Sequence, residues 1–167
     1  MLNKKNLFNF VYAIALVGAI MSCVGILSEL LNVLQLRGVL VQNTVNMKEE
    51  TFMEPFLFYL IAFLVSAVAV TFLLLYMLGK INKTAVNSVL AAACAIMLVL
   101  SFVFIVVIRE PSSSKKDYLY LIQYFDYMVY YTFRSGVMSF VANVGILLVC
   151  NLLDGKRKKE QADDKEN

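Results

Sequence analysis

Four long apolar runs, separated by polar segments, occupy more than half of this chain of 167 residues. They are residues 7–27, 56–78, 86–108 and 133–153. Lipid offers the backbone no hydrogen-bond partner, so a segment that crosses a bilayer folds as a helix or as part of a closed barrel. A helix needs ~20 apolar residues to cross ~30 Å of hydrocarbon, and each run has that length. The runs therefore predict an all-α fold, an integral membrane four-helix bundle.

The composition excludes two other classes of protein. Hydrophobic residues make up 60% of the chain and charged residues 16%, and the mean hydropathy is +0.74, which exceeds what a soluble domain of this size hides in its core. The net charge is +3, but no basic groove interleaved with aromatic residues accompanies it. We therefore expect this chain to lie in a lipid bilayer and to bind no nucleic acid.

Lysine and arginine are distributed unevenly between the two sides of the predicted bundle. The tails and the short central connection hold nine: Lys4, Lys5, Lys80, Lys83, Lys156, Arg157, Lys158, Lys159 and Lys165. The two longer connections hold five: Arg37, Lys48, Arg109, Lys115 and Lys116. Because basic residues accumulate on the cytoplasmic side, both termini are predicted to be cytoplasmic, and an even number of spans agrees. Abundant Lys, Asn and Ile are compatible with a bacterial inner (plasma) membrane.

The predicted organisation is one transmembrane domain, residues 1–154, followed by a disordered charged cytoplasmic tail, residues 155–167. The first helix keeps helical spacing beyond the membrane as far as Arg37, where Gly38 offers a stop. Pro55 is well placed to open the second helix.

The second and third helices are predicted to form an antiparallel hairpin, because the connection at residues 79–85 is too short to cross the membrane. Small residues favour close packing in this hairpin. They are Ala62, Ser66 and Ala69 in the second helix and Ala91, Ala92 and Ala95 in the third.

An aromatic segment, residues 117–132, precedes the fourth run. Tyr120, Tyr124, Tyr127 and Tyr131 follow helical spacing and share one face. A helix over residues 117–153 would measure ~55 Å, well beyond the hydrocarbon thickness. The segment is therefore predicted to protrude, bend or lie at the outer interface.

The three cysteines, Cys23, Cys94 and Cys150, lie inside apolar runs, where a thiol behaves as a small hydrophobic group. No disulfide framework is predicted. An alternative stays open for Cys23, since the residues before it resemble a bacterial lipoprotein cleavage site. Intact-protein mass distinguishes the two interpretations.

Enzymatic chemistry is not predicted. The chain has no histidine, which removes imidazole-based metal and haem sites and histidine acid/base catalysis. No pair of carboxylates lies at helical spacing within a span, and no phosphate-binding glycine motif is present. We expect no catalytic residue, no metal and no cofactor.

One candidate site lies near the outer boundary. Glu29 is ~33 Å along the helix from Leu7, and Arg134 is ~28 Å from Leu153, so the two are at similar depth. We hypothesise an ion pair between Glu29 and Arg134, with Tyr127, Tyr130 and Tyr131 around the guanidinium through cation–π contacts. As structure, this cluster would staple the first helix to the fourth; as function, it would be an outward-facing ligand or partner site.

A second candidate is the polar stripe Ser135, Ser139 and Asn143, at successive i+4 steps of the fourth helix. Uncharged polar residues of this kind favour helix–helix packing, and Asn143 is the candidate for a substrate contact if the protein is a transporter.

Two functions compete at this stage. The first is a small non-enzymatic accessory, assembly, immunity or regulatory protein that acts through helix–helix contacts with other membrane proteins. The alternative is a subunit of an oligomeric transporter or channel, because four helices leave little room for a pore in one copy. A homo-oligomer or other membrane proteins are therefore the predicted partners.

Overall fold

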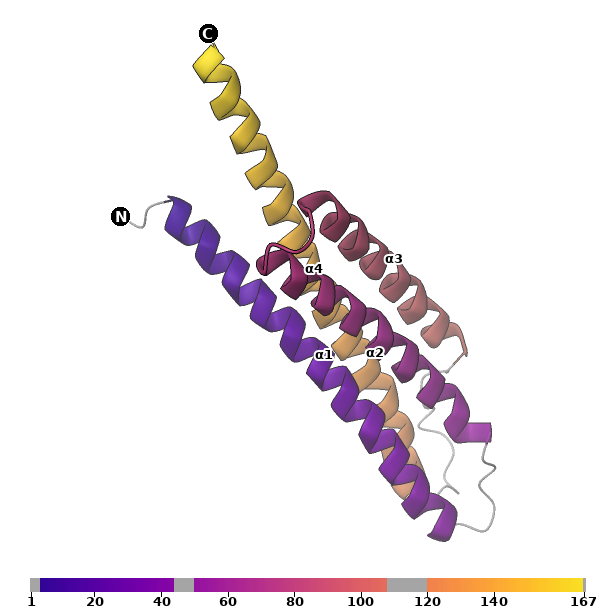
Figure 1. The fold of residues 1–167 in the computed structure, drawn as a ribbon. Coiled ribbons are helices and arrows are strands. Elements are labelled where there is room, and N and C mark those ends of the chain that lie inside the picture. Colours follow the sequence, from indigo (N-terminus) through magenta and orange to yellow (C-terminus); the bar gives the residue numbers. More distant parts are fainter. Residues whose placement is uncertain (1–3, 44–49, 108–119, 167) are drawn as a thin grey trace.

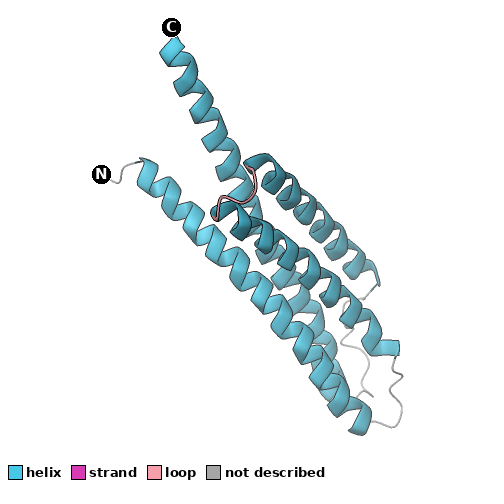
Figure 2. Ribbon diagram, in the orientation of Figure 1, coloured by secondary structure: helices cyan, strands magenta, loops and turns pink. Residues whose placement is uncertain are grey.

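The computed structural model describes residues 4–43, 50–107 and 120–166, and within them it describes side chains at 6–35, 55–107 and 129–154. The described residues form α1 (Lys4–Asn43), α2 (Glu50–Met77), α3 (Lys83–Val107) and α4 (Tyr120–Glu166), as Figures 1 and 2 show. Each helix holds a segment long and apolar enough to cross a membrane. These segments are Asn6–Gln35, Pro55–Met77, Lys83–Val107 and Val129–Asp154. The all-α fold with four candidate membrane spans is therefore confirmed.

The helices are arranged around a square. α1 packs against α2 and α4, α3 packs against the same two helices, and α2 also touches α4 across the diagonal. Successive helices are antiparallel, so the two ends of the chain lie at one end of the bundle (Figure 1). We call this the terminal end and the other the distal end.

The turn between α2 and α3 explains why these two helices pair so closely. Gly79 has a φ of 69°, which glycine adopts without strain. The Gly79 N–H donates to the Tyr76 carbonyl and the Lys80 N–H to the Leu75 carbonyl, which closes the end of α2 in a Schellman motif. Asn82 then caps α3, because its side-chain oxygen accepts the Ala85 N–H at 2.8 Å.

The small residues expected in this hairpin behave differently on its two helices. Ala62, Ser66 and Ala69 of α2 are completely buried, as predicted. Ala91, Ala92 and Ala95 of α3 are exposed, so the prediction that they pack inside the bundle is wrong. The buried face of α3 is instead Val86, Leu90, Ala93, Met97, Ser101 and Phe104. Because α3 is apolar around its whole circumference, its sequence does not mark which face turns inward.

The outer surface of the bundle is as apolar as its core. Met21, Phe102 and Val149 are each more than half exposed, and further large hydrophobic side chains face outward on all four helices. An apolar exterior of this extent is typical of a helix bundle that is surrounded by lipid.

The helix ends differ from the predicted ones. α1 continues through Gly38 to Asn43, and α2 begins at Glu50, so Pro55 lies inside it instead of opening it. Glycine only weakens a helix, and proline is tolerated near a helix N-terminus, where few backbone bonds are lost. The connection between α1 and α2 is therefore shorter than predicted. Residues 44–49 lie outside the described part.

α4 runs from Tyr120 to Glu166, 47 residues or ~70 Å, so the predicted disordered tail continues as helix at residues 155–166. Lys, Arg, Glu, Gln and Ala favour helix, and extending an existing helix avoids the cost of nucleation. The aromatic segment is the first part of this same helix, with residues 117–119 outside the described part.

Candidate functional site

The distal half of the core is aromatic. Phe104 of α3 stacks on Phe133 of α4 with ring centroids 4.1 Å apart, and Phe58 of α2 meets both rings edge-on at 5.2 and 6.0 Å. Tyr130 adds a tilted contact to Phe104 at 6.1 Å. These rings fix the relative positions of α2, α3 and α4 around the residues of the first candidate site.

Tyr59 of α2 places a hydroxyl inside this aromatic region. The hydroxyl lies 2.6 Å from Thr132 Oγ1 and 3.2 Å from the Val129 carbonyl oxygen, both on α4. Glu29 of α1 is close enough to Tyr59 for an electrostatic interaction, and its carboxylate accepts a hydrogen bond from the Asn32 side chain at 3.4 Å. The hydrogen bond of Glu29 is therefore to a residue of its own helix.

Arg134 does not join this group. No ion pair between Glu29 and Arg134 is present among the described side chains, and Arg134 is exposed on the outside of α4. The reason is the helical phase: Gly136 faces Ile26 of α1, and Arg134 is two residues, ~200°, around the helix from it. Glu29 and Arg134 therefore lie at a similar depth, but Arg134 is on the side of α4 that faces away from α1.

Of the three tyrosines of the hypothesis, Tyr130 and Tyr131 contact each other. Tyr130 is buried, and its ring meets those of Phe104 and Tyr131. Tyr131 is 41% exposed, on the same side of the bundle surface as the outward-facing Arg134 and Ser135. The side chain of Tyr127 lies outside the described part, so its predicted contact with Arg134 stays a prediction.

The polar stripe of α4 is divided between a helix contact and the surface. Ser139 accepts a hydrogen bond from Ser22 of α1 at 3.2 Å, and the Asn143 amide donates to the Ser139 carbonyl at 2.8 Å. A Cβ placed on Gly18 would collide with Asn143, so glycine lets α1 approach at this level. Ser135 is exposed. Ser139 and Asn143 therefore serve helix packing.

Two polar contacts at the terminal end were missed by the sequence analysis. Asn151 of α4 donates to Asn87 of α3 at 2.9 Å, and Lys83 forms an ion pair with Asp154 at 3.1 Å. A signal was present: Lys83 and Asn87 are one turn apart on α3, and Asn151 and Asp154 are one turn apart on α4. A comparison of these two patterns would have predicted that α3 and α4 pack together at the terminal end.

The cysteines are free thiols in the structure, and no cluster of metal-binding side chains occurs among the described residues. Cys23 is buried and accepts a hydrogen bond from Ser66 of α2 at 3.3 Å. It thus takes part in the contact between α1 and α2, within an unbroken helix.

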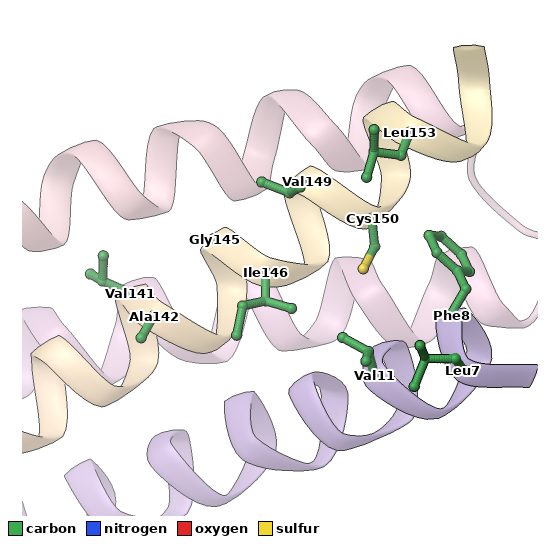
Figure 3. A pocket seen from close by; sticks show the side chains of 10 residues that line it. All are labelled: Leu7, Phe8, Val11, Val141, Ala142, Gly145, Ile146, Val149, Cys150 and Leu153. Atoms are coloured by element: carbon green, nitrogen blue, oxygen red, sulfur yellow. The ribbon is translucent and has the colours of Figure 1, made fainter. Parts of the chain in front are cut away.

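An apolar groove of about 650 Å³ opens between α1 and α4 at the terminal end. α1 lines it with Leu7, Phe8 and Val11, and α4 lines it from Val141 to Leu153. Figure 3 shows the two helices diverging there, with Gly145 leaving part of the α4 wall bare.

No protein-family model matches the chain, and neither the curated proteins nor the solved structures contain a match. The fold and its four spans define the class, a helical membrane protein.

Proposed function

We propose that this protein is a non-enzymatic accessory or regulatory membrane protein that acts through contacts of its helices with another membrane protein. In this proposal both termini are cytoplasmic and the membrane is a bacterial inner membrane. The exposed face at the distal half of α4, formed by Tyr131, Arg134, Ser135 and Met138, is the contact surface; we call it the α4 face.

The observation that carries the proposal is the outward position of Arg134. An arginine near the centre of a bilayer costs about 2.5–3.5 kcal/mol on insertion scales, and Arg134, ~28 Å along α4 from Leu153, lies toward the outer boundary, where this cost is smaller. Its long side chain lowers that cost by reaching toward the interface. No described acidic side chain of the bundle pairs with it. An acidic group on a partner helix would supply the missing charge and orient the partner.

The interior of the bundle supports a contact function over transport. The polar side chains that link the described spans are bonded to one another, as in the pairs Ser22–Ser139 and Asn87–Asn151. Between these pairs the core consists of aliphatic and aromatic side chains. A path for ions or polar solutes needs polar groups that face a common water-filled space.

Site-specific photocrosslinking tests the proposal. A photoreactive amino acid at Ser135 should yield one defined adduct with another membrane protein in native membranes. The same probe at Thr71, an exposed polar residue on the surface of α2, is the matched control and should not yield this adduct. Replacing Arg134 with Ala should remove the adduct, whereas replacing Lys80, an exposed cation outside the spans, should leave it.

Two results would contradict the proposal. One is an adduct that forms equally at Ser135 and Thr71, since this indicates random collision. The other is an adduct only between copies of this chain together with solute flux in liposomes, since this indicates the oligomeric transporter.

A further inference from the structure

The groove between α1 and α4 extends through about one leaflet of a bilayer. The α4 lining runs from Val141 to Leu153, ~18 Å, and half of a ~30 Å hydrocarbon core is ~15 Å; the α1 lining runs from Leu7 to Val11, ~6 Å. Toward the middle of the membrane the groove closes, because Gly18 packs on Asn143 and Ser22 bonds to Ser139. The cavity therefore begins at the terminal end and stops near the midplane.

These dimensions fit a lipid chain better than a protein helix. A transmembrane helix is 10–12 Å wide and crosses both leaflets, so it cannot follow a groove that ends halfway. The lining is apolar apart from the thiol of Cys150, which leaves nothing to bind a polar solute. An acyl chain needs only apolar contact along one leaflet.

The residues that continue the two groove walls at the terminal end are basic in the sequence. Lys4 and Lys5 immediately precede the α1 wall, and residues 156–159, all lysine or arginine, follow the α4 wall three residues after Leu153. Both helices continue through these positions. Residues 1–28 contain no acidic residue, and Asp154 is paired with Lys83. Glu160 follows the basic run 156–159, and the six basic residues next to the two walls favour an anionic headgroup at this end.

We propose that the groove binds one anionic phospholipid, with an acyl chain between α1 and α4 and the headgroup at the basic residues of the terminal end. On the predicted topology this lipid belongs to the cytoplasmic leaflet, where each nearby cation favours an anionic surface by about 1 kcal/mol, or about five-fold in affinity. The site is independent of the α4 face, which lies at the distal end.

Tryptophan quenching by brominated lipid tests this site, because the chain has no tryptophan of its own. Phe8→Trp places one reporter in the groove. The full-length variant is reconstituted in phosphatidylcholine that contains a rising fraction of phosphatidylglycerol with brominated chains. We expect half-quenching at a fraction at least about five-fold lower than with brominated phosphatidylcholine. Ile146→Trp, on an exposed position of the opposite wall, is a second reporter if the first variant does not fold.

The control reporter is Leu74→Trp on α2, which is exposed near the terminal end with Lys80 and Lys83 close in sequence. It measures the general attraction of phosphatidylglycerol to basic residues, and it should show a clearly smaller preference. The same preference at both reporters would overturn the proposal.

A plug of the groove gives the decisive comparison. Gly145 lines the groove and a Cβ added to it meets open space, so Gly145→Leu adds bulk to the groove lining. Gly25→Leu also points into open space but lies outside the groove, which makes it a matched control. In the Phe8→Trp background, Gly145→Leu should abolish the preference and Gly25→Leu should retain it. Retention of the preference in both would refute the site.

Discussion

Two tyrosine hydroxyls are buried in this bundle, one with hydrogen-bond partners and one without a partner in the described part of the chain. Tyr59 shares hydrogen bonds with Thr132 and the Val129 carbonyl across the distal end. Tyr12, near Tyr76 and Cys150, has a buried hydroxyl without a hydrogen-bond partner in the described part of the chain. A buried polar group stabilises a fold only if it is paired, so the same chemical change should act differently at the two positions.

Tyr59→Phe should therefore lower the free energy of unfolding by about 0.6–1.7 kcal/mol, from the average to the maximum measured for hydrogen bonds between membrane helices. Tyr12→Phe should leave stability unchanged or raise it, because it removes an unpaired hydroxyl. Thermal unfolding in detergent, followed by the loss of the monodisperse peak in size-exclusion chromatography, compares the two variants. Equal losses of stability would show that the hydroxyl of Tyr59 contributes nothing specific.

The depth of a residue along its helix could be predicted from the sequence, but the direction in which its side chain points could not. Counting residues from the inner ends placed Glu29 and Arg134 at one level, because a helix rises by a fixed amount per residue. Their ion pair required in addition that both face each other. The spans are apolar on every side, so no polar boundary in the sequence showed that Arg134 points away from α1.

At the scale of the helices, α1 and α4 form a seam whose two halves differ. In the middle and distal part, Gly18, Ser22 and Ile26 of α1 oppose Asn143, Ser139 and Gly136 of α4. At the terminal end the same two helices separate around the groove. Small and polar residues thus bring the two backbones together at the levels of Gly18, Ser22 and Ile26.

Disulfide formation tests this register. In a chain whose three cysteines are replaced, the pair Ser22→Cys and Ser139→Cys should crosslink on oxidation, since the two hydroxyl oxygens are 3.2 Å apart. The pair Ser22→Cys and Ser135→Cys, displaced by about one turn of α4, should not. Mobility in non-reducing gels measures the crosslink. Preferential crosslinking of the second pair would mean that α4 is displaced along α1.

Span number and approximate helix positions could be predicted because apolar length is a strong signal. Helix ends were the weakest part of that prediction. Gly38 and Pro55 mark common boundaries in water-soluble proteins, yet the helices continue through both. The contact of Asn87 with Asn151 also escaped prediction, because an isolated asparagine near a span end looks like an interfacial residue until its partner helix is known.

For the whole molecule, the even number of antiparallel helices places both chain ends at one end of the bundle (Figure 1). The excess of lysine and arginine there predicts that this end is cytoplasmic. Reporter fusions should show both termini inside the cell, and substitution of the basic residues in both tails and in the α2–α3 turn by neutral ones should weaken that orientation. Reporters on opposite sides, or both outside, would contradict the topology.

α4 is much longer than the hydrocarbon layer that it crosses, ~70 Å against ~30 Å. If α4 crosses a bilayer at its apolar segment, its first and last residues extend beyond the hydrocarbon on opposite sides. Because α4 is one uninterrupted helix without proline from Tyr120 to Glu166, we expect a tilt applied at one of its ends to be transmitted to the other.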